Sequence, residues 1–195
     1  MKETLENKRK KLEIISKSPI LKEEINIYDL VYDKNDNFIG YTMKIEKLKT
    51  AYDIKNINTK IKILKIIRKK LELFNENDIY IGDFNPKNII LSDKIKLCDL
   101  DNLRIGNLDF DALNTFGLLH LKRKFDKNTI DNFSFNLQTI SYIGNINPPY
   151  IFDYIREEGL PRKLNTKNNK KLLLDLLTTN SSNNEYFIDN LRKFI

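Results

Sequence analysis

Apolar residues recur every three or four positions over residues 57–74, and this spacing predicts an amphipathic helix. The apolar positions are Ile57, Ile61, Leu64, Ile67, Leu71 and Phe74, with several lysine and arginine residues between them. A helix with this pattern buries one face against other elements. We therefore expect residues 57–74 to contribute to the core.

Two more elements are predicted before this helix. Residues 2–17 form a charged pattern that Ser18-Pro19 brings to an end, which is typical of a helix with a proline stop. Its apolar positions are Leu5, Leu12 and Ile15. Residues 25–45 contain two largely apolar stretches on either side of the polar segment Lys34–Asn37. This arrangement predicts two antiparallel strands joined by a turn.

After residue 74 the chain is predicted to form a second hairpin and then mostly helices. The short apolar runs 89–91 and 95–98 are separated by Ser92-Asp93-Lys94, a tight turn signal. Asp131 is predicted to open a helix to about Ile143, because aspartate is a favoured N-cap residue. Two closing helices are predicted over 166–177 and 185–194, whereas residues 102–130 match no regular pattern.

The composition is typical of a folded cytoplasmic protein. A chain of 195 residues with 41% hydrophobic residues is long enough for one domain, or for one domain with a small appendage. No apolar stretch is long enough to span a bilayer, and charged residues are frequent among the first twenty positions, so neither a membrane segment nor a signal peptide is expected. The single cysteine, Cys98, cannot form an internal disulfide, which favours a reducing compartment.

The net charge of +7 bears on the choice of partner. Positive residues are concentrated at Lys8–Lys11 and over 44–70 and 162–171. Such a surface favours an anionic partner: a nucleotide, a nucleic acid, an acidic protein or a nucleoprotein. A solvated lysine-rich face explains the same pattern without any partner.

Three polar residues flank the second predicted hairpin and indicate a specific chemistry. Asp83 lies in the loop before it, Asn88 directly precedes its first strand, and Asp99 directly follows its second strand. Phosphoryl transfer from a nucleotide needs one carboxylate to orient the attacking hydroxyl. It also needs an amide oxygen and a second carboxylate to hold Mg²⁺. The simpler interpretation is that these residues are turn formers, as Gly-Asp and Asn-Pro often are.

The segments "IGDFNPKNII" and "KLCDLD" resemble the catalytic loop and the metal-binding strand of the protein-kinase-like family. The resemblance implies that Asp83 is the catalytic aspartate, that Asn88 and Asp99 are magnesium ligands, and that the cofactors are Mg²⁺ and ATP. It also implies an α+β fold, with a reduced small lobe over 1–50 that contains a helix and a β-hairpin. A mainly helical large lobe would follow over 51–195.

Other segments extend the resemblance. "LVYDKNDNFIGYTMKI" resembles the last two strands of the family's small lobe, which lead to a hinge near Lys44–Lys47. Lys44, Ile45 and Cys98 would then line the nucleotide pocket. "TIDNFSFNL" resembles the start of the large central helix, where Asp131 would bind the backbone of the catalytic loop.

The sequence also departs from the family pattern. Ile81 and Gly82 replace the usual His-Arg pair before the catalytic aspartate, and Asp101 replaces a glycine. No segment before residue 25 resembles a Gly-rich loop followed by a strand with a phosphate-pairing lysine. The helix over 2–17 resembles the family's C-helix, with Glu3, Glu6 and Glu13 as candidates for its glutamate.

These departures leave three functions open. Lys10 or Lys11, or a partner chain, would supply the missing positive charge in an active phosphotransferase. Without such a substitute, the protein would be an inactive pseudokinase-like module that binds or inhibits a protein partner. The third alternative is a nucleic-acid or nucleoprotein binder that uses the positive charge.

Overall fold

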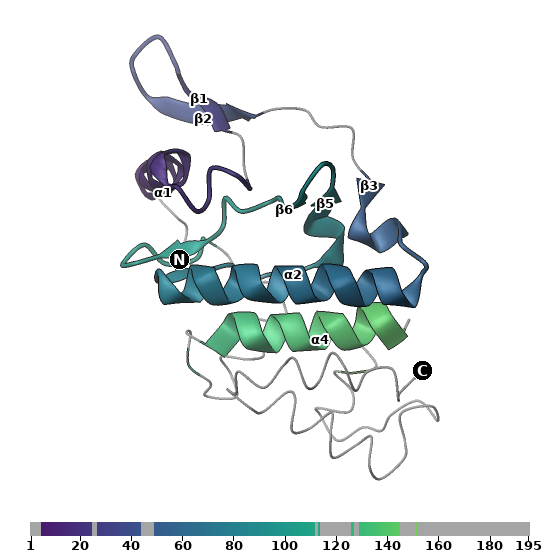
Figure 1. The fold of residues 1–195 in the computed structure, drawn as a ribbon. Helices are drawn as coiled ribbons and strands as arrows, with labels where there is room; N and C mark the ends of the chain where they lie inside the picture. The colour runs from purple at the N-terminus through teal and green to yellow at the C-terminus, as the bar shows by residue number, and fades with distance from the viewer. Residues whose placement is uncertain are drawn as a thin grey trace.

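The computed structural model describes residues 5–24, 27–43, 49–111, 113, 126, 129–144 and 151. Its helices are α1 (Leu5–Lys17), α2 (Ile57–Glu76) and α4 (Ile130–Gly144), with short 3-10 turns at Ala51–Asp53 and Pro86–Asn88. Its strands are β1 (Ile27–Tyr32), β2 (Phe38–Met43), β3 (Lys49–Thr50), β4 (Ile79–Tyr80), β5 (Ile89–Leu91), β6 (Ile95–Leu97) and β7 (Arg104–Ile105). Figure 1 shows the β1–β2 hairpin above α1, and α2 and α4 packed side by side below the short strands.

The β1–β2 hairpin confirms the antiparallel pair predicted over 25–45, as far as the described residues extend. Asp33 orders its turn, because the side chain accepts hydrogen bonds from the backbone N–H groups of Asn35 at 2.8 Å and Asn37 at 2.9 Å. Asp36 takes the left-handed backbone conformation that such a turn requires, with φ 60°. The polar turn therefore fixes the hairpin through local bonds.

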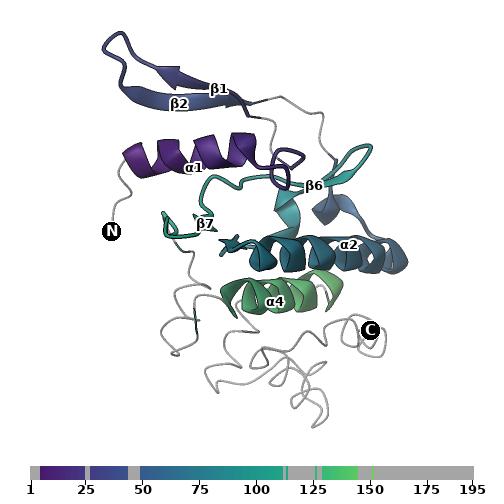
Figure 2. The same ribbon diagram turned by 60° about the vertical axis from the view of Figure 1, so that its left-hand side comes forward.

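Helix α1 lies between this hairpin and the β6–β7 segment (Figure 2). Leu12 and Ile15 are fully buried, as their spacing predicts, and Lys11 is buried beside them. Leu5 differs from the prediction, since it is 63% exposed in the first described turn of the helix. The apolar contact of α1 is therefore confined to its later turns.

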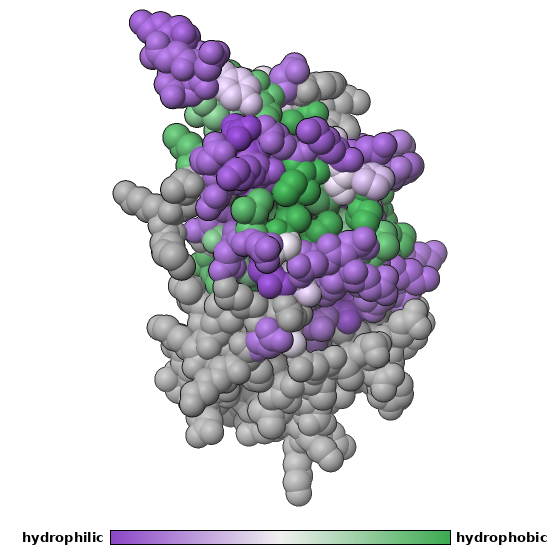
Figure 3. All heavy atoms as spheres, turned by 90° about the vertical axis from the view of Figure 1, so that its left-hand side faces the viewer, coloured by the Kyte–Doolittle hydropathy of each residue, from purple (hydrophilic) through white to green (hydrophobic). Residues whose placement is uncertain are grey.

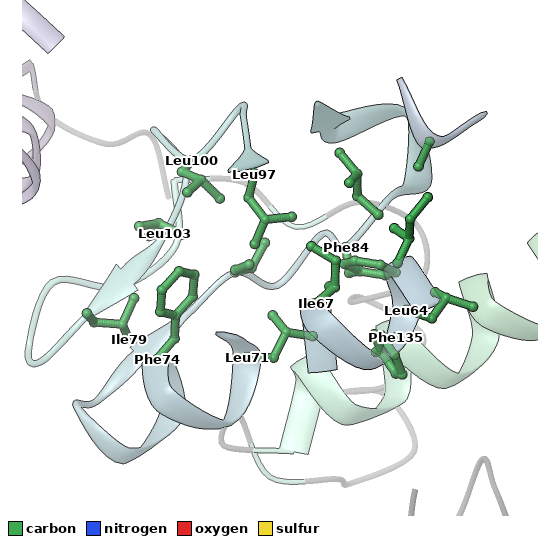
Figure 4. Packing of buried hydrophobic residues seen from close by; sticks show 14 of the residues in the cluster. Leu64, Ile67, Leu71, Phe74, Ile79, Phe84, Leu97, Leu100, Leu103 and Phe135 are labelled. Carbon is green, nitrogen blue, oxygen red and sulfur yellow. The ribbon is translucent and has the colours of Figure 1, made fainter. Parts of the chain in front are cut away.

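Helix α2 confirms the clearest helix prediction and runs two residues further than expected, to Glu76. Its start is set by Asn56, whose side chain accepts a hydrogen bond from the Thr59 N–H at 3.0 Å. Five of the six predicted apolar positions are buried, and Ile57 is partly buried. Figure 4 shows Leu64, Ile67, Leu71 and Phe74 of this helix in the core with Phe84, Leu97 and Phe135.

The second predicted hairpin is present as strands β5 and β6, with Ile89 opposite Leu97 and Leu91 opposite Ile95. Strand β6 ends at Leu97, one residue before the predicted end at Cys98. Strand β3 pairs with the outer edge of β5. A separate antiparallel pair joins β4 to β7. Strands β3, β4 and β7 have only two residues each, which is too short for an alternating pattern that would predict them.

The start of α4 corrects one prediction. The helix begins at Ile130, so Asp131 lies inside its first turn and is not the N-cap. The Asp131 carboxylate is fully buried and binds another segment of the chain. Almost every residue of α4 is buried, which agrees with its position against α2.

Several expectations fall outside the described residues. These are the closing helices over 166–177 and 185–194 and most of the segment 102–130. The boundary between a small lobe over 1–50 and a large lobe over 51–195 stays a prediction. None of the described helices combines the length and apolar character needed to cross a membrane.

Candidate functional site

The β5–β6 hairpin brings Asn88 and Asp99 together. Asn88 is the last residue of the 3-10 turn before β5, and Asp99 follows β6 after Cys98. The backbone N–H of Cys98 donates to the Asn88 carbonyl at 2.9 Å, which closes the open end of the hairpin. The Asn88 side-chain Nδ2 then donates to Asp99 Oδ2 at 3.4 Å. Two of the three predicted site residues are therefore adjacent.

The backbone around Asp99 turns its side chain toward solvent. Asp99 is exposed and has φ 59°, in the left-handed region that aspartate tolerates better than most residues. Its neighbour Leu100 is 1% exposed and packs in the core. A buried residue beside an exposed carboxylate fixes the direction of Asp99. Strained backbone of this kind is often found at functional sites.

The loop that holds Asp83 is positioned from α4. The Asp131 carboxylate accepts hydrogen bonds from the backbone N–H groups of Ile81 at 2.9 Å and Gly82 at 2.7 Å. This confirms the predicted contact between Asp131 and the loop. On the other side of Asp83, Phe84 is 1% exposed, and its ring lies 5.1 Å from the ring of Phe135. Asp83 is itself partly buried between these two anchors.

The ionisation of Asp131 is shaped by its surroundings. Burial raises the pKa of Asp131 to about 6, against the opposing effect of the two backbone hydrogen bonds from the loop. The positive charges of Arg68 and Arg104 also oppose the rise. Near neutral pH the carboxylate is therefore mostly ionised, and each of its two oxygens accepts a backbone N–H.

Gly82 is required by a contact that the sequence did not reveal. Its φ is +71°, and a Cβ at this position would lie 2.5 Å from Cε1 of Phe110. Both the backbone conformation and the Phe110 ring therefore exclude a side chain here. Phe110 lies 28 positions away in the sequence, so no local pattern could have identified the contact.

Comparisons with known proteins place this geometry in a wider context. No family model matches the chain, and no curated protein matches it. Among solved structures, the chain is similar to the PknI kinase domain of Mycobacterium tuberculosis, with a TM-score of 0.58 and 14% identity. The alignment covers 97% of this chain and 79% of that domain. A mutant form of the same domain gives a TM-score of 0.57, with the same identity and 97% and 78% coverage.

The chain has a protein-kinase-like fold. The likeness at 14% identity concerns the fold, which is α+β with a reduced β-hairpin part and a helical part. It confirms the fold predicted from the loop, the strand and the central-helix segment. The activity of the site is a separate question that rests on the residues themselves.

The charged residues of α1 differ from those expected of the C-helix in a kinase-like fold. Glu6 and Glu13 both bind Arg9 on the surface of their own helix. Lys10 lies 3.6 Å from Glu6 and is also directed along this surface. Glu3 lies outside the described residues. No described glutamate of α1 is therefore seen in a contact with the candidate site.

Two other lysines of α1 face the chain beyond Asp99. Lys11 is 1% exposed and pairs with Asp111. Lys8 donates to Asp101 Oδ2 at 2.9 Å. Lys10 and Lys11 are the predicted sources of positive charge, and Lys8 is not among them. The spacing i, i+3 places Lys8 and Lys11 on one face of the helix. This spacing was the feature of the sequence that could have indicated Lys8.

The remaining predicted nucleotide contacts have different outcomes. Cys98 is partly buried, and burial raises the pKa of its thiol, with a further contribution from the charge of Asp99. The thiol is therefore held in its neutral form, which makes it a poor nucleophile. Its contact with a nucleotide stays a prediction. Lys44 and Ile45 lie outside the described residues.

The chemistry of the side chains fits magnesium. Mg²⁺ prefers oxygen ligands and is usually bound by one or two carboxylates, with water and substrate phosphates completing its coordination. Asp99 and Asn88 supply a carboxylate and an amide oxygen. Asn88 now presents Nδ2 to Asp99, and a half-turn of its amide would present Oδ1 instead. The described residues contain no group of three or more His, Cys, Asp or Glu residues suited to hold a metal, so the nucleotide would have to complete the coordination.

Proposed function

We propose that this protein binds a magnesium nucleotide and transfers its terminal phosphoryl group to a hydroxyl acceptor. The observation that carries the proposal is the contact between Asn88 and Asp99, 3.4 Å apart at the end of the β5–β6 hairpin. A kinase-like fold with 97% of the chain aligned to a kinase domain supports it. The acceptor is not specified by any residue in the described part of the chain.

Each residue has a distinct role in this proposal. Asn88 and Asp99 hold the cation, which neutralises phosphate charge when it is bound. Asp83 would orient the acceptor hydroxyl and accept its proton as the new oxygen–phosphorus bond forms and the bond between the terminal phosphorus and the departing nucleoside diphosphate breaks. Asp131 keeps the Asp83 loop in place through the backbone bonds to Ile81 and Gly82. A fixed carboxylate acts more effectively than a mobile one because its orientation is established before the reaction.

The test combines nucleotide binding with phosphoryl transfer. Mg²⁺-ATP at about 100 times its dissociation constant should stabilise the folded chain by about 2.7 kcal/mol, seen as a higher melting temperature. Asp99→Asn should lose most of this shift, because it weakens the cation site. Asp83→Asn should keep the shift and lose phosphoryl transfer to added acceptors, since an amide does not accept the proton.

A matched control for these variants is Asp93→Asn. Asp93 is exposed in the turn between β5 and β6 and binds Ser92, away from the ends of the hairpin that carry Asn88 and Asp99. This control should keep both the shift and the transfer. No melting shift in the wild type at millimolar Mg²⁺-ATP would refute the proposal. Transfer that survives Asp83→Asn unchanged would refute the role of Asp83.

A second candidate function is the binding of a protein partner without catalysis. Large apolar side chains are exposed on α1 and on the hairpin: Leu5, Ile14, Tyr32, Ile39 and Met43. Figure 3 shows apolar residues gathered on one face between hydrophilic residues above and below. Exposed apolar residues of this kind are typical of interaction surfaces. If this function holds instead, Asp83→Asn and Asp99→Asn should both keep the cellular effect of the protein.

A further inference from the structure

Side chains from α1, from β2 and from the segment after β6 form a polar cluster near Asp99. The proposed function does not use this cluster. Lys8 of α1 donates to Asp101 at 2.9 Å, and Asp101 lies two residues after Asp99. Tyr41 of β2 is partly buried against the core, and β2 packs against α1. Burial raises the pKa of the Tyr41 hydroxyl, the charge of Asp101 adds to this rise, and the charge of Lys8 opposes it. We call Lys8, Tyr41 and Asp101 the Lys8 cluster.

The carboxylates of this region and the phosphates of a bound nucleotide would favour a positively charged side chain nearby. Asp83, Asp99 and Asp101 lie within nineteen positions of one another in the sequence, and a nucleotide would add its phosphates to them. One Mg²⁺ offsets only part of the charge of a nucleoside triphosphate. A positive side chain near Asp99 would offset more of it, in a place where the protein partly excludes water.

Lys8 is the cation of α1 best placed for this task among the described residues. Its side chain is 33% exposed, so it reaches both Asp101 and the surface. Lys11 is 1% exposed and bound to Asp111, which leaves little space for a ligand. Arg9 and Lys10 pair with glutamates of their own helix. Position and exposure therefore select one residue from four consecutive basic ones.

The contact with Asp101 leaves capacity for a ligand. A lysine ammonium has three N–H donors, and the contact with Asp101 uses one of them. Asp101 holds the long Lys8 side chain in one direction, which lowers the entropy lost when a phosphate binds. The same contact gives Asp101 a role at a position where the family has glycine.

We propose that Lys8 binds the phosphate groups of the nucleotide, with Asp101 as its positioning residue. This inference rests on the proposed function and adds to it the residue that recognises the phosphates. It predicts that Lys8 distinguishes ligands by their phosphates and not by their base or ribose. It also predicts that the phosphate-binding cation comes from a helix.

The test compares Mg²⁺-ATP with adenosine by isothermal titration calorimetry on the full chain. Lys8→Ala should weaken Mg²⁺-ATP binding about 10- to 100-fold, as expected for a lost hydrogen bond between charged groups. Adenosine binding should be unchanged. Lys8→Arg should keep most of the affinity for Mg²⁺-ATP. The control is Lys10→Ala, on the same helix and exposed, which should change neither ligand.

Asp101→Asn separates this role from a structural one. If Lys8 serves only the ion pair with Asp101, both Lys8→Ala and Asp101→Asn should weaken binding in the same way. If Lys8 binds phosphate and Asp101 only positions it, Asp101→Asn should weaken Mg²⁺-ATP binding much less than Lys8→Ala does, because the asparagine Oδ1 can still accept a hydrogen bond from Lys8. This variant also keeps the inference testable if Lys8→Ala does not fold.

The outcomes distinguish the inference from the proposed function. Wild-type protein that binds Mg²⁺-ATP with the same affinity as Lys8→Ala would overturn the inference and leave the proposed function standing. An equal loss of ATP and adenosine affinity in Lys8→Ala would also overturn it. Wild-type protein that binds no Mg²⁺-ATP would overturn both.

Discussion

At the scale of single residues, the loop that carries Asp83 depends on two neighbours that differ in kind. Gly82 leaves space for the Phe110 ring, and Asp131 accepts the backbone N–H groups of Ile81 and Gly82. The Phe110 ring restricts the loop by steric contact, and the Asp131 carboxylate holds it by hydrogen bonds. Each makes a separate prediction about the stability of the loop.

Gly82→Ala should destabilise the folded protein by about 1–3 kcal/mol, because the new Cβ meets Phe110 and the backbone is left-handed. Urea unfolding followed by circular dichroism measures this loss. Gly40→Ala is the matched control, since a Cβ at Gly40 has nothing within 4 Å. A loss for Gly82→Ala as small as that for Gly40→Ala would contradict the close contact.

Asp131→Asn should destabilise the protein by an amount that depends on pH. An asparagine has only one acceptor oxygen for the two N–H groups, so one of them loses its partner. The pKa of Asp131 is raised from its ordinary value of 3.8 to about 6 in the folded protein. The folded state therefore binds the proton more tightly than the unfolded state, and the contribution of Asp131 to stability falls as pH rises from about 4 to 6.

The difference in unfolding free energy between wild type and Asp131→Asn should then be larger at pH 4 than at pH 7. Urea titrations of both proteins at several pH values measure it. The asparagine variant lacks this titration, so subtracting its curve removes the contributions of other carboxylates. A difference that stays constant, or grows with pH, would show that the pKa of Asp131 is not raised.

At the scale of elements, Glu24 links three parts of the chain. It follows α1, and its carboxylate accepts the backbone N–H of Leu97 in β6 at 2.7 Å. It also binds the ammonium of Lys70 on α2. Glu24 is 7% exposed, so its charge is shielded from water and compensated by these two donors. The segment after α1 is therefore fixed to both β6 and α2.

Glu24→Gln should lower the free energy of unfolding by about 1–3 kcal/mol, since it leaves the buried Lys70 contact without its negative partner. Glu23→Gln is the matched control, because Glu23 is 60% exposed and pairs with Lys94 at 3.3 Å. An exposed pair of this kind contributes at most about 1 kcal/mol. Equal effects of the two variants in thermal unfolding would argue against the linking role of Glu24.

At the scale of the whole molecule, the net charge of +7 does not describe one uniform surface. Several lysines of the basic segments bind internal partners. Lys11 pairs with Asp111, Lys70 pairs with Glu24, and Lys60 donates to the Tyr142 carbonyl at 2.7 Å. Other lysines, among them Lys10 and Lys62, are exposed. Only the exposed group is suited to an anionic partner.

Two triple variants of equal net charge test this division. Lys10, Lys62 and Lys69 are exposed, and their replacement by glutamate should leave the melting temperature nearly unchanged. Replacement of Lys11, Lys60 and Lys70 by glutamate should prevent folding, because it places negative charge beside Asp111, the Tyr142 carbonyl and Glu24. Circular dichroism of both proteins gives the measurement. Similar melting temperatures of the two variants would mean that stability depends on net charge and not on which lysines are replaced.

The sequence predicted those parts of the fold that depend on local patterns. The spacing of apolar residues located α2, and the turn residues located both hairpins. It predicted that Asp83, Asn88 and Asp99 converge on one site. The structure places Asn88 against Asp99, and the convergence of Asp83 on this pair stays a prediction. The sequence did not predict the roles of Phe110, Glu24 or Lys8, because each acts through a residue far away in the sequence. The resemblance predicted that Asp131 binds the loop, and this is confirmed. The prediction that Asp131 caps the helix was wrong, because the helix begins at Ile130 and the bonds to the loop bury Asp131 in the first turn.

The bonds from Asp131 to Ile81 and Gly82 join residues 50 and 49 positions apart, and this separation bears on the order of events during synthesis. A ribosome releases the Asp83 loop well before it releases α4. Until α4 docks, two backbone N–H groups of that loop have no carboxylate to bind, and closing so long a segment is slow compared with forming a hairpin. The β5–β6 hairpin can therefore form on the nascent chain, whereas the Asp83 loop becomes ordered only after α4 has emerged. A nascent chain arrested before Ile130 would present Asn88 and Asp99 without an ordered Asp83.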